Sequence, residues 1–203
     1  DLASDNVRRV ADWIMDHGDH TGKPFILADK VNALMYVFDK DGKLISRAPA
    51  LFGKDTGDVM QGDSLAGGKR ITPAGRFETA AHDAGTDLYG ETLPLEGSNG
   101  VAIHKLYLET PSERRPQRLA SNDPRQHRIS YGCVNVDNAV MSEVLAPHFR
   151  EGGTVYVLPE TKTGEGAAPV FAETNAASRE GSGLHYSPKG VSVEERLREQ
   201  DSA

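Results

Sequence analysis

The stretch Ser130-Tyr131-Gly132-Cys133-Val134-Asn135 holds the only cysteine among the 203 residues of the chain. Cysteine carries a thiolate fraction near neutral pH, which makes it a nucleophile for covalent catalysis. Gly132 permits positive φ and a close approach of substrate to the backbone. The successive N–H groups of Tyr131, Gly132 and Cys133 suit the stabilisation of an oxyanion. A lone cysteine is more often a small buried hydrophobic residue, so the catalytic interpretation requires a base.

His104 is the predicted base. It ends the apolar run Gly100-Val101-Ala102-Ile103-His104, whose alternating character is typical of a strand. The tip of a strand can present an imidazole to a nucleophile on the next element. His127 is a rival base, but it lies in a predicted loop, and a strand holds catalytic geometry better.

A His after a short apolar strand, followed by Ser-x-Gly-Cys-apolar-Asn, resembles the L,D-transpeptidase catalytic domain (YkuD-like) family. The segment Thr72-Pro73-Ala74-Gly75-Arg76-Phe77 is similar to the family's Thr-Pro-x-Gly-x-Phe segment, and residues 33–52 resemble its opening hairpin. The chain departs from the family in two places. Tyr131 stands where many members have His, and residues 109–128 resemble an insertion between His104 and the cysteine motif.

The resemblance implies an α+β fold that is mainly β with a few helices. We expect an L,D-transpeptidase-like β-sandwich or barrel with an N-terminal helix and a further helix after the catalytic cysteine. The expected organisation is an N-terminal helix within residues 1–22 packed on the domain, a catalytic domain at 23–160, and a low-complexity, largely irregular tail at 161–203.

The resemblance also implies a reaction and its residues. Cys133 would attack a peptidoglycan stem peptide to form a thioester acyl-enzyme, with His104 as base and the backbone carbonyl of Lys105 as the third member. Tyr131 and Gly132 are the predicted oxyanion donors. The predicted substrate-binding residues are Arg128, Ser130 and Asn135.

The residues leave several outcomes open. A second amine as acceptor would give a transpeptidase, whereas water would give an L,D-carboxypeptidase or amidase. The resemblance implies that carbapenems acylate the cysteine. A non-catalytic cell-wall-binding module with a buried thiol is the alternative from another class. A papain-like hydrolase is disfavoured, because its His follows the Cys, and only His148 and His185 do so here.

Composition limits the partners and cofactors. The net charge is −7 and the sequence has no long run of Lys or Arg, so nucleic acid is not an expected partner. We predict neither a metal nor another cofactor, because paired cysteines, His-Glu-x-x-His and a phosphate-binding loop motif are missing from the sequence. No apolar stretch reaches the roughly 18 residues that span a bilayer. We expect a periplasmic or other extracytoplasmic location, with a signal peptide already removed.

Periodicity predicts the elements along the chain. A helix is expected at 5–17, with Ser4 as N-cap and Gly18 as its end, and a second helix at 137–149. Expected strands are at 24–28, 33–39, 43–51, 76–81, 88–95, 101–108 and 154–158. The Arg-rich segment 109–128 is predicted to be a solvated loop, or else a flap whose guanidinium groups hold substrate carboxylates. A capping-box pattern predicts one more short helix from Ser192.

Overall fold

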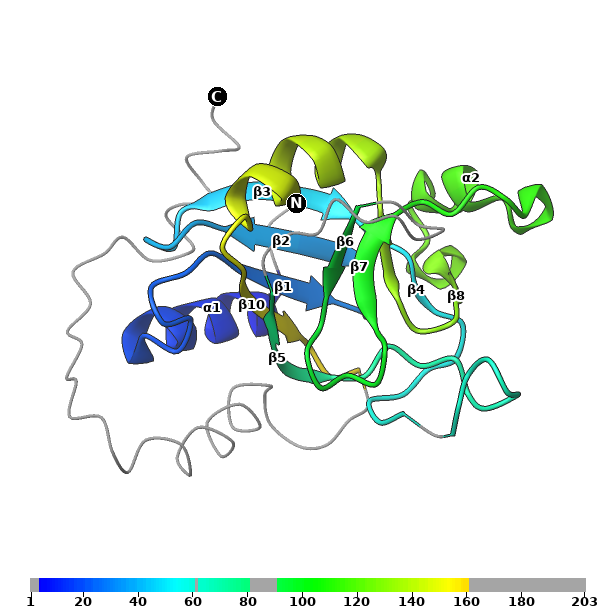
Figure 1. Ribbon diagram of the computed structural model, residues 1–203, viewed down its shortest axis with the longest axis horizontal. Helices are drawn as coiled ribbons and strands as arrows, with labels where there is room; N and C mark the ends of the chain where they lie inside the picture. Colours follow the sequence, from blue (N-terminus) through cyan, green and yellow to red (C-terminus); the bar gives the residue numbers. More distant parts are fainter. Residues whose placement is uncertain (1–3, 61, 81–90, 161–203) are drawn as a thin grey trace.

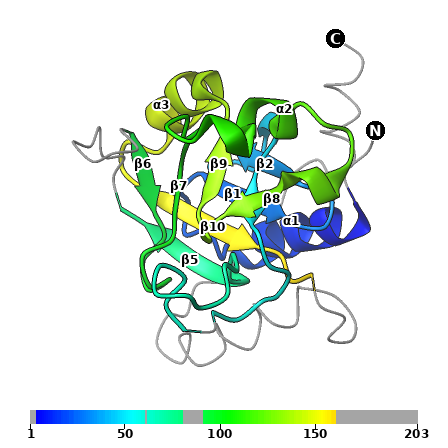
Figure 2. The ribbon, with the colours of Figure 1, turned by 90° about the vertical axis from the view of Figure 1, so that its right-hand side faces the viewer.

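The computed structural model describes residues 4–60, 62–80 and 91–160 (Figures 1 and 2). Its largest sheet has the strand order β3-β2-β1-β10-β5. The bounds are Phe25–Asp29 for β1, Leu34–Phe38 for β2, Leu44–Pro49 for β3, Gly75–Thr79 for β5 and Gly153–Val157 for β10. β1 and β10 are parallel, and the other neighbours are antiparallel. The predicted hairpin is confirmed as β2 and β3, whose turn uses a φ of 77° at Gly42.

One face of this sheet is covered by helix α1, Asp5–His17. Ser4 accepts a hydrogen bond from the Val7 N–H at its start, and Gly18 ends it in the left-handed conformation, as the sequence predicted. The buried side of the helix consists of Val7, Val10, Ala11, Ile14 and Met15. These side chains form one apolar cluster with alternate residues of the sheet, among them Phe25, Leu27, Tyr36, Phe38 and Tyr156.

The opposite face of the same strands packs against a second layer. Its three-stranded sheet has the order β6-β7-β9, with bounds Thr92–Pro94, Ala102–Lys105 and Val134–Val136. The larger core lies between the layers and takes the other alternate residues, including Ile26, Ala28, Met35, Val37, Val155 and Val157. Figure 2 shows α1 and α3 on opposite sides of the large sheet. Two covered faces explain why β2 is apolar at successive positions, and this mixed architecture confirms the predicted α+β class.

The predicted helix at 137–149 forms with a different geometry. Residues Val140–Leu145 (η3) are π-helical, and the Ala146 N–H donates to the Met141 carbonyl five residues back. A short α-helix, α3, follows at Ala146–His148. Pro147 has no N–H to bond the carbonyl of residue 143, so a regular α ladder cannot be complete at this point.

Residues 109–128, predicted to be a solvated loop or a flap, contain regular elements. They contain two 3₁₀ turns, η1 at Pro111–Glu113 and η2 at Pro124–His127, with helix α2 at Arg115–Leu119 between them. Each of the three elements has a proline in its first turn, where the fixed φ of proline favours helical backbone. Strand β8, Arg128–Ser130, follows and pairs in parallel with β4, Phe52–Gly53. Figure 1 shows α2 at the opposite end of the molecule from α1.

Some sequence predictions fall outside the described residues. The tail at 161–203 and the short helix from Ser192 lie entirely there. The strand expected at 88–95 lies there in part, and its described portion contains β6.

The buried tyrosine of β2 generates a prediction about alkaline stability. Burial of Tyr36, aided by the Asp29 carboxylate and opposed by Arg47, raises its pKa from 10.0 to about 12. A raised pKa means that the neutral phenol stabilises the fold below pH 10, and that this contribution is lost as the pH rises through 12. We expect the free energy of unfolding to fall by about 2 kcal/mol more across this window in the wild type than in Tyr36→Phe.

Urea unfolding at pH 8, 10 and 12 measures this difference. Tyr131→Phe is the control, because that side chain is 40% exposed. Identical pH dependence in the wild type and Tyr36→Phe would contradict the assignment.

Candidate active site

The pairing of β7 with β9 brings the predicted nucleophile and base to one place. The two strands are parallel, with Ile103 opposite Val134 and His104 opposite Asn135. Cys133 directly precedes β9, and residues two apart in an extended chain share a face. Cys133 therefore lies on the same side as Asn135 and His104. The thiol residue is partly exposed, whereas His104 is only 3% exposed.

The contacts of His104 define its tautomer. Its Nδ1 lies 2.7 Å from the Lys105 carbonyl oxygen, which can only accept, so Nδ1 carries the proton. Its Nε2 lies 3.3 Å from Nδ2 of Asn135, which can only donate, so Nε2 has the lone pair. This neutral form is the one a general base needs. The contact between Nδ1 of His104 and the Lys105 carbonyl is the one that the predicted role of Lys105 requires. A catalytic role of Lys105 stays a prediction.

The cysteine loop, residues 130–133, is closed by Ser130. The Ser130 hydroxyl donates to the Cys133 carbonyl at 2.6 Å and accepts from the Gly132 N–H at 3.1 Å. Gly132 has a φ of 133°, and a Cβ there would lie 2.9 Å from the Ile71 carbonyl oxygen. Only glycine therefore fits without strain. Because the Gly132 N–H is engaged in the loop, its predicted oxyanion role requires this bond to be exchanged for one to substrate.

The Thr-Pro segment, residues 72–77, is hydrogen-bonded to the cysteine loop through Thr72. The fully buried Thr72 hydroxyl donates to the Gly132 carbonyl and accepts from the Gly53 N–H, both at 2.8 Å. Thr72 is held in turn by Lys30, whose ammonium donates to the Thr72 carbonyl at 2.8 Å and to Asp58 Oδ1 at 2.9 Å. Sequence reasoning used Thr72 only as a family signature and missed Lys30, because a single lysine after a strand carries no pattern.

The three predicted substrate-binding residues all face protein partners in the structure. Arg128 pairs with the Glu160 carboxylate and donates to the Lys30 carbonyl at 2.9 Å. Ser130 is 2% exposed, and Asn135 is fully buried. Ser130 is hydrogen-bonded within the cysteine loop, and Asn135 contacts His104. Direct contact with substrate stays a prediction for all three.

His127, the rival base, is buried at the C-terminal end of the insertion, where it ends η2. Its Nδ1 lies 3.0 Å from the Ala50 carbonyl oxygen and its Nε2 lies 2.9 Å from the Ser121 carbonyl oxygen. Both ring nitrogens are thus directed at backbone acceptors, and neither is placed to take a proton from the thiol. His127 instead ties the insertion to the segment before β4.

The arginines of the insertion also differ from the predicted flap. Arg118 donates to the carbonyls of Glu113 and Gln126, and Arg125 pairs with Asp123. Arg115 is buried and donates to Glu113 and to the Asn135 side chain. Most of these guanidinium groups therefore stabilise the insertion itself. A cation that sequence reasoning missed lies at the cysteine loop, where the Arg70 guanidinium is 3.7 Å from the centre of the Tyr131 ring.

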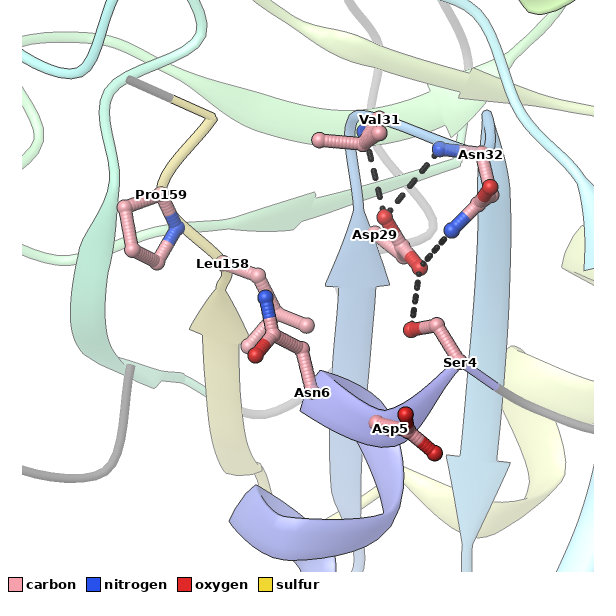
Figure 3. Close-up of a pocket in the computed structure, with 8 residues that line it drawn as sticks. All are labelled: Ser4, Asp5, Asn6, Asp29, Val31, Asn32, Leu158 and Pro159. Atoms are coloured by element: carbon pink, nitrogen blue, oxygen red, sulfur yellow. Dashed lines mark hydrogen bonds between the residues drawn. The ribbon is translucent and has the colours of Figure 1, made fainter. Parts of the chain in front are cut away.

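A separate cavity of about 300 Å³ opens at the start of α1 (Figure 3). It is lined by Ser4, Asp5, Asn6, Asp29, Val31, Asn32, Leu158 and Pro159. The Asp29 carboxylate already accepts four hydrogen bonds, from the Ser4 hydroxyl, the Val31 N–H, and the backbone and side chain of Asn32. The cavity shares no residue with the cysteine loop, β7 or β9. Within the described ranges no three His, Cys, Asp or Glu side chains gather as a metal site would need.

Removal of the Thr72 hydroxyl tests the support of the cysteine loop. Thr72→Val keeps the shape but leaves the Gly53 N–H and the Gly132 carbonyl unpaired, at a cost of about 1–3 kcal/mol each. We expect a loss of about 2–4 kcal/mol in the free energy of unfolding, measured with urea.

Thr154→Val is the matched control. The Thr154 hydroxyl is also buried but has no hydrogen-bond partner among the described residues. We expect this variant to be as stable as the wild type or more so. Equal losses in both variants would show that Thr72 acts only by packing.

Comparison with known proteins gives the family. Solved structures similar to the chain include an L,D-transpeptidase from Mycobacterium smegmatis, with 17% identity, a TM-score of 0.44, and coverage of 66% of this chain and 58% of that chain. The helical cell shape determining protein of Campylobacter jejuni has 17% identity, a TM-score of 0.46, and coverage of 78% and 58%.

The chain spans less than two thirds of the length of these proteins. No curated protein matches it. The sequence model of the L,D-transpeptidase catalytic domain (YkuD) matches residues 23–157, more than half of the chain. The chain therefore belongs to the L,D-transpeptidase catalytic domain family.

Proposed function

We propose that this protein is a peptidoglycan L,D-transpeptidase with Cys133 as its nucleophile. The observation that supports the proposal is the β7–β9 register, which pairs His104 with Asn135, two residues after the partly exposed Cys133, while Nδ1 of His104 faces the Lys105 carbonyl. A non-catalytic wall-binding module would have no need for this arrangement. Family membership supplies the reaction class.

The proposed reaction has two acyl transfers. The sulfur of Cys133 attacks the carbonyl carbon of the donor stem peptide, while Nε2 of His104 takes the thiol proton in exchange for its contact with Asn135 Nδ2. The C–N bond to the terminal D-alanine breaks, and the amine leaves with that proton. An acceptor amine then attacks the thioester, gives its proton to His104, and releases Cys133, which regains a proton from His104. Backbone N–H groups of the cysteine loop would stabilise both tetrahedral intermediates.

Arg70 is the proposed contact for a carboxylate of the donor stem. Its guanidinium lies over the Tyr131 ring, two residues before the nucleophile in sequence. No carboxylate side chain in the described part of the chain pairs with it. An arginine plane matches a carboxylate bidentately, and stacking on an aromatic ring leaves its N–H edge available. Tyr131 would then act as a platform for Arg70 in place of the His of many relatives.

The proposed location is extracytoplasmic, because peptidoglycan lies outside the cytoplasmic membrane. Among the described residues, no helix has both the length and the apolar composition needed to cross a bilayer. A second stem amine is the proposed acceptor. Water as the acceptor would give the hydrolytic outcome from the same acyl-enzyme.

A product analysis tests the function. We expect the chain, incubated with a disaccharide tetrapeptide muropeptide, to give a cross-linked dimer and free D-alanine, detected by liquid chromatography and mass spectrometry. Release of D-alanine without a dimer would assign a hydrolase instead. Cys133→Ala should remain folded and yield neither product, and turnover by this variant would exclude the mechanism.

A carbapenem provides a second probe of the nucleophile. One similar structure is an L,D-transpeptidase in complex with imipenem. We expect the intact mass of this chain to rise by one imipenem, and the adduct to be missing in Cys133→Ala. An adduct of equal yield in both proteins would place the acylated group elsewhere.

The role of His104 is tested by alkylation of Cys133 with iodoacetamide. We expect His104→Gln to slow alkylation at pH 7 by about ten- to a hundredfold, because the thiol loses the base that takes its proton. His127→Gln is the control, since the ring nitrogens of that residue face backbone carbonyls. Slower alkylation only in His127→Gln would transfer the role to His127.

A further inference from the structure

We propose that Arg115, from the insertion, is a positioning residue that fixes the tautomer of His104 through the side chain of Asn135. One guanidinium N–H of Arg115 donates to Asn135 Oδ1, and Asn135 Nδ2 lies 3.3 Å from His104 Nε2. We call the chain of contacts Arg115–Asn135–His104 the relay. Its role in catalysis rests on the proposed function, whereas the contacts are present in the structure whatever the function is.

Arg115 is built into the interior. Its side chain is 6% exposed, its Nε donates to Glu113 Oε2 at 2.7 Å, and its guanidinium carbon lies 5.5 Å from the centre of the Tyr107 ring. A buried guanidinium is costly unless its N–H groups are satisfied. Glu113 compensates the charge, and the remaining contact is directed at a neutral amide beside the predicted base.

The direction of the relay follows from the donor inventory of each side chain. Arginine can only donate, so the Asn135 atom that faces it must be the carbonyl oxygen. The amide NH₂ must then face His104, and it can only donate to a lone pair on Nε2. The Lys105 carbonyl on the other side of the ring can only accept. Arg115 thus prevents the amide from turning, and the amide selects the Nδ1–H tautomer.

The same geometry acts on the protonated ring. When Nε2 takes a proton, its N–H faces the NH₂ of Asn135, and two donors oppose each other. The relay therefore disfavours a resting thiolate–imidazolium pair and favours the return of the proton to a leaving amine. Without Arg115 the amide can turn, and its oxygen can accept a hydrogen bond from the protonated ring, which stabilises that pair.

The charged and titratable groups around His104 come from three sides of the site. The loop before β9 contributes Cys133, and the insertion contributes Arg115 with Glu113. Strand β7, which carries His104, contributes Lys105, and Tyr107 follows that strand. The strand on the other side, β6, places Thr92 opposite His104, and threonine does not titrate.

The test is the pH profile of Cys133 alkylation by iodoacetamide in the native protein, a measurement that does not depend on any peptide substrate. In Arg115→Met we expect the midpoint of the profile to move to lower pH by about half to one unit. Arg115→Lys keeps a donor for Asn135 and should retain the wild-type midpoint. A profile in Arg115→Met that superimposes on that of the wild type would overturn the proposal.

Arg118→Met is the matched control. It removes the same charge from the same helix, and among the described residues Arg118 bonds only the backbone carbonyls of Glu113 and Gln126. An equal shift in this variant would assign the effect to loosening of the insertion and overturn the proposal. If Arg115→Met does not fold, Asn135→Ala decides, because it removes the NH₂ that opposes the protonated ring without adding a charge, and its midpoint should also fall. An unchanged midpoint in Asn135→Ala would overturn the proposal. Failure of the proposed function would appear separately, as missing muropeptide products with the alkylation shifts intact.

Discussion

The parallel pairing of β7 with β9 is the constraint on which the site depends. Side chains at paired positions of parallel strands stand beside each other on one face. The register therefore brings residue 104 to residue 135 and leaves the thiol residue at the start of the second strand. A shift of one residue would turn His104 to the other face and into the apolar core between the layers. The chemistry predicted for the site thus depends on strand register.

A parallel pair also requires a long connection, and this chain uses that connection to complete the site. Two parallel neighbours cannot be joined by a tight turn, so a dozen or more residues must cross between them. Here the crossing segment folds into η1, α2 and η2 and then pairs as β8. It places Arg115 against Asn135, and it places His127 against the Ala50 carbonyl. The segment that resembles an insertion in the sequence therefore supports the predicted base, because its Arg115 contacts Asn135 and Asn135 contacts His104.

The cysteine loop keeps its shape through buried polar contacts. Gly132 adopts a backbone conformation that other residues rarely take, and its carbonyl is held by Thr72. Thr72 is held in turn by Lys30, whose side chain is fully buried and paired with Asp58. Such groups are costly to bury but are strongly directional once satisfied. They give the loop one conformation, which a purely apolar support would not specify.

Local patterns in the sequence were sufficient to predict α1 with both of its ends and the β2–β3 hairpin, because caps, turns and periodicity act over a few residues. The α+β class and the family were predicted from the resemblance of the cysteine motif and the Thr-Pro segment to a known family. The cysteine motif and His104 were also recognisable as a pair. Only the tertiary structure decided the π-helical geometry of η3, the helical turns of the insertion and the partners of Lys30, Arg115 and Asn135. The helical turns form at prolines, whereas the partners depend on side chains that meet across 20 or more residues of chain, as Arg115 meets Asn135. Such meetings follow from register and packing, which no short stretch of sequence encodes.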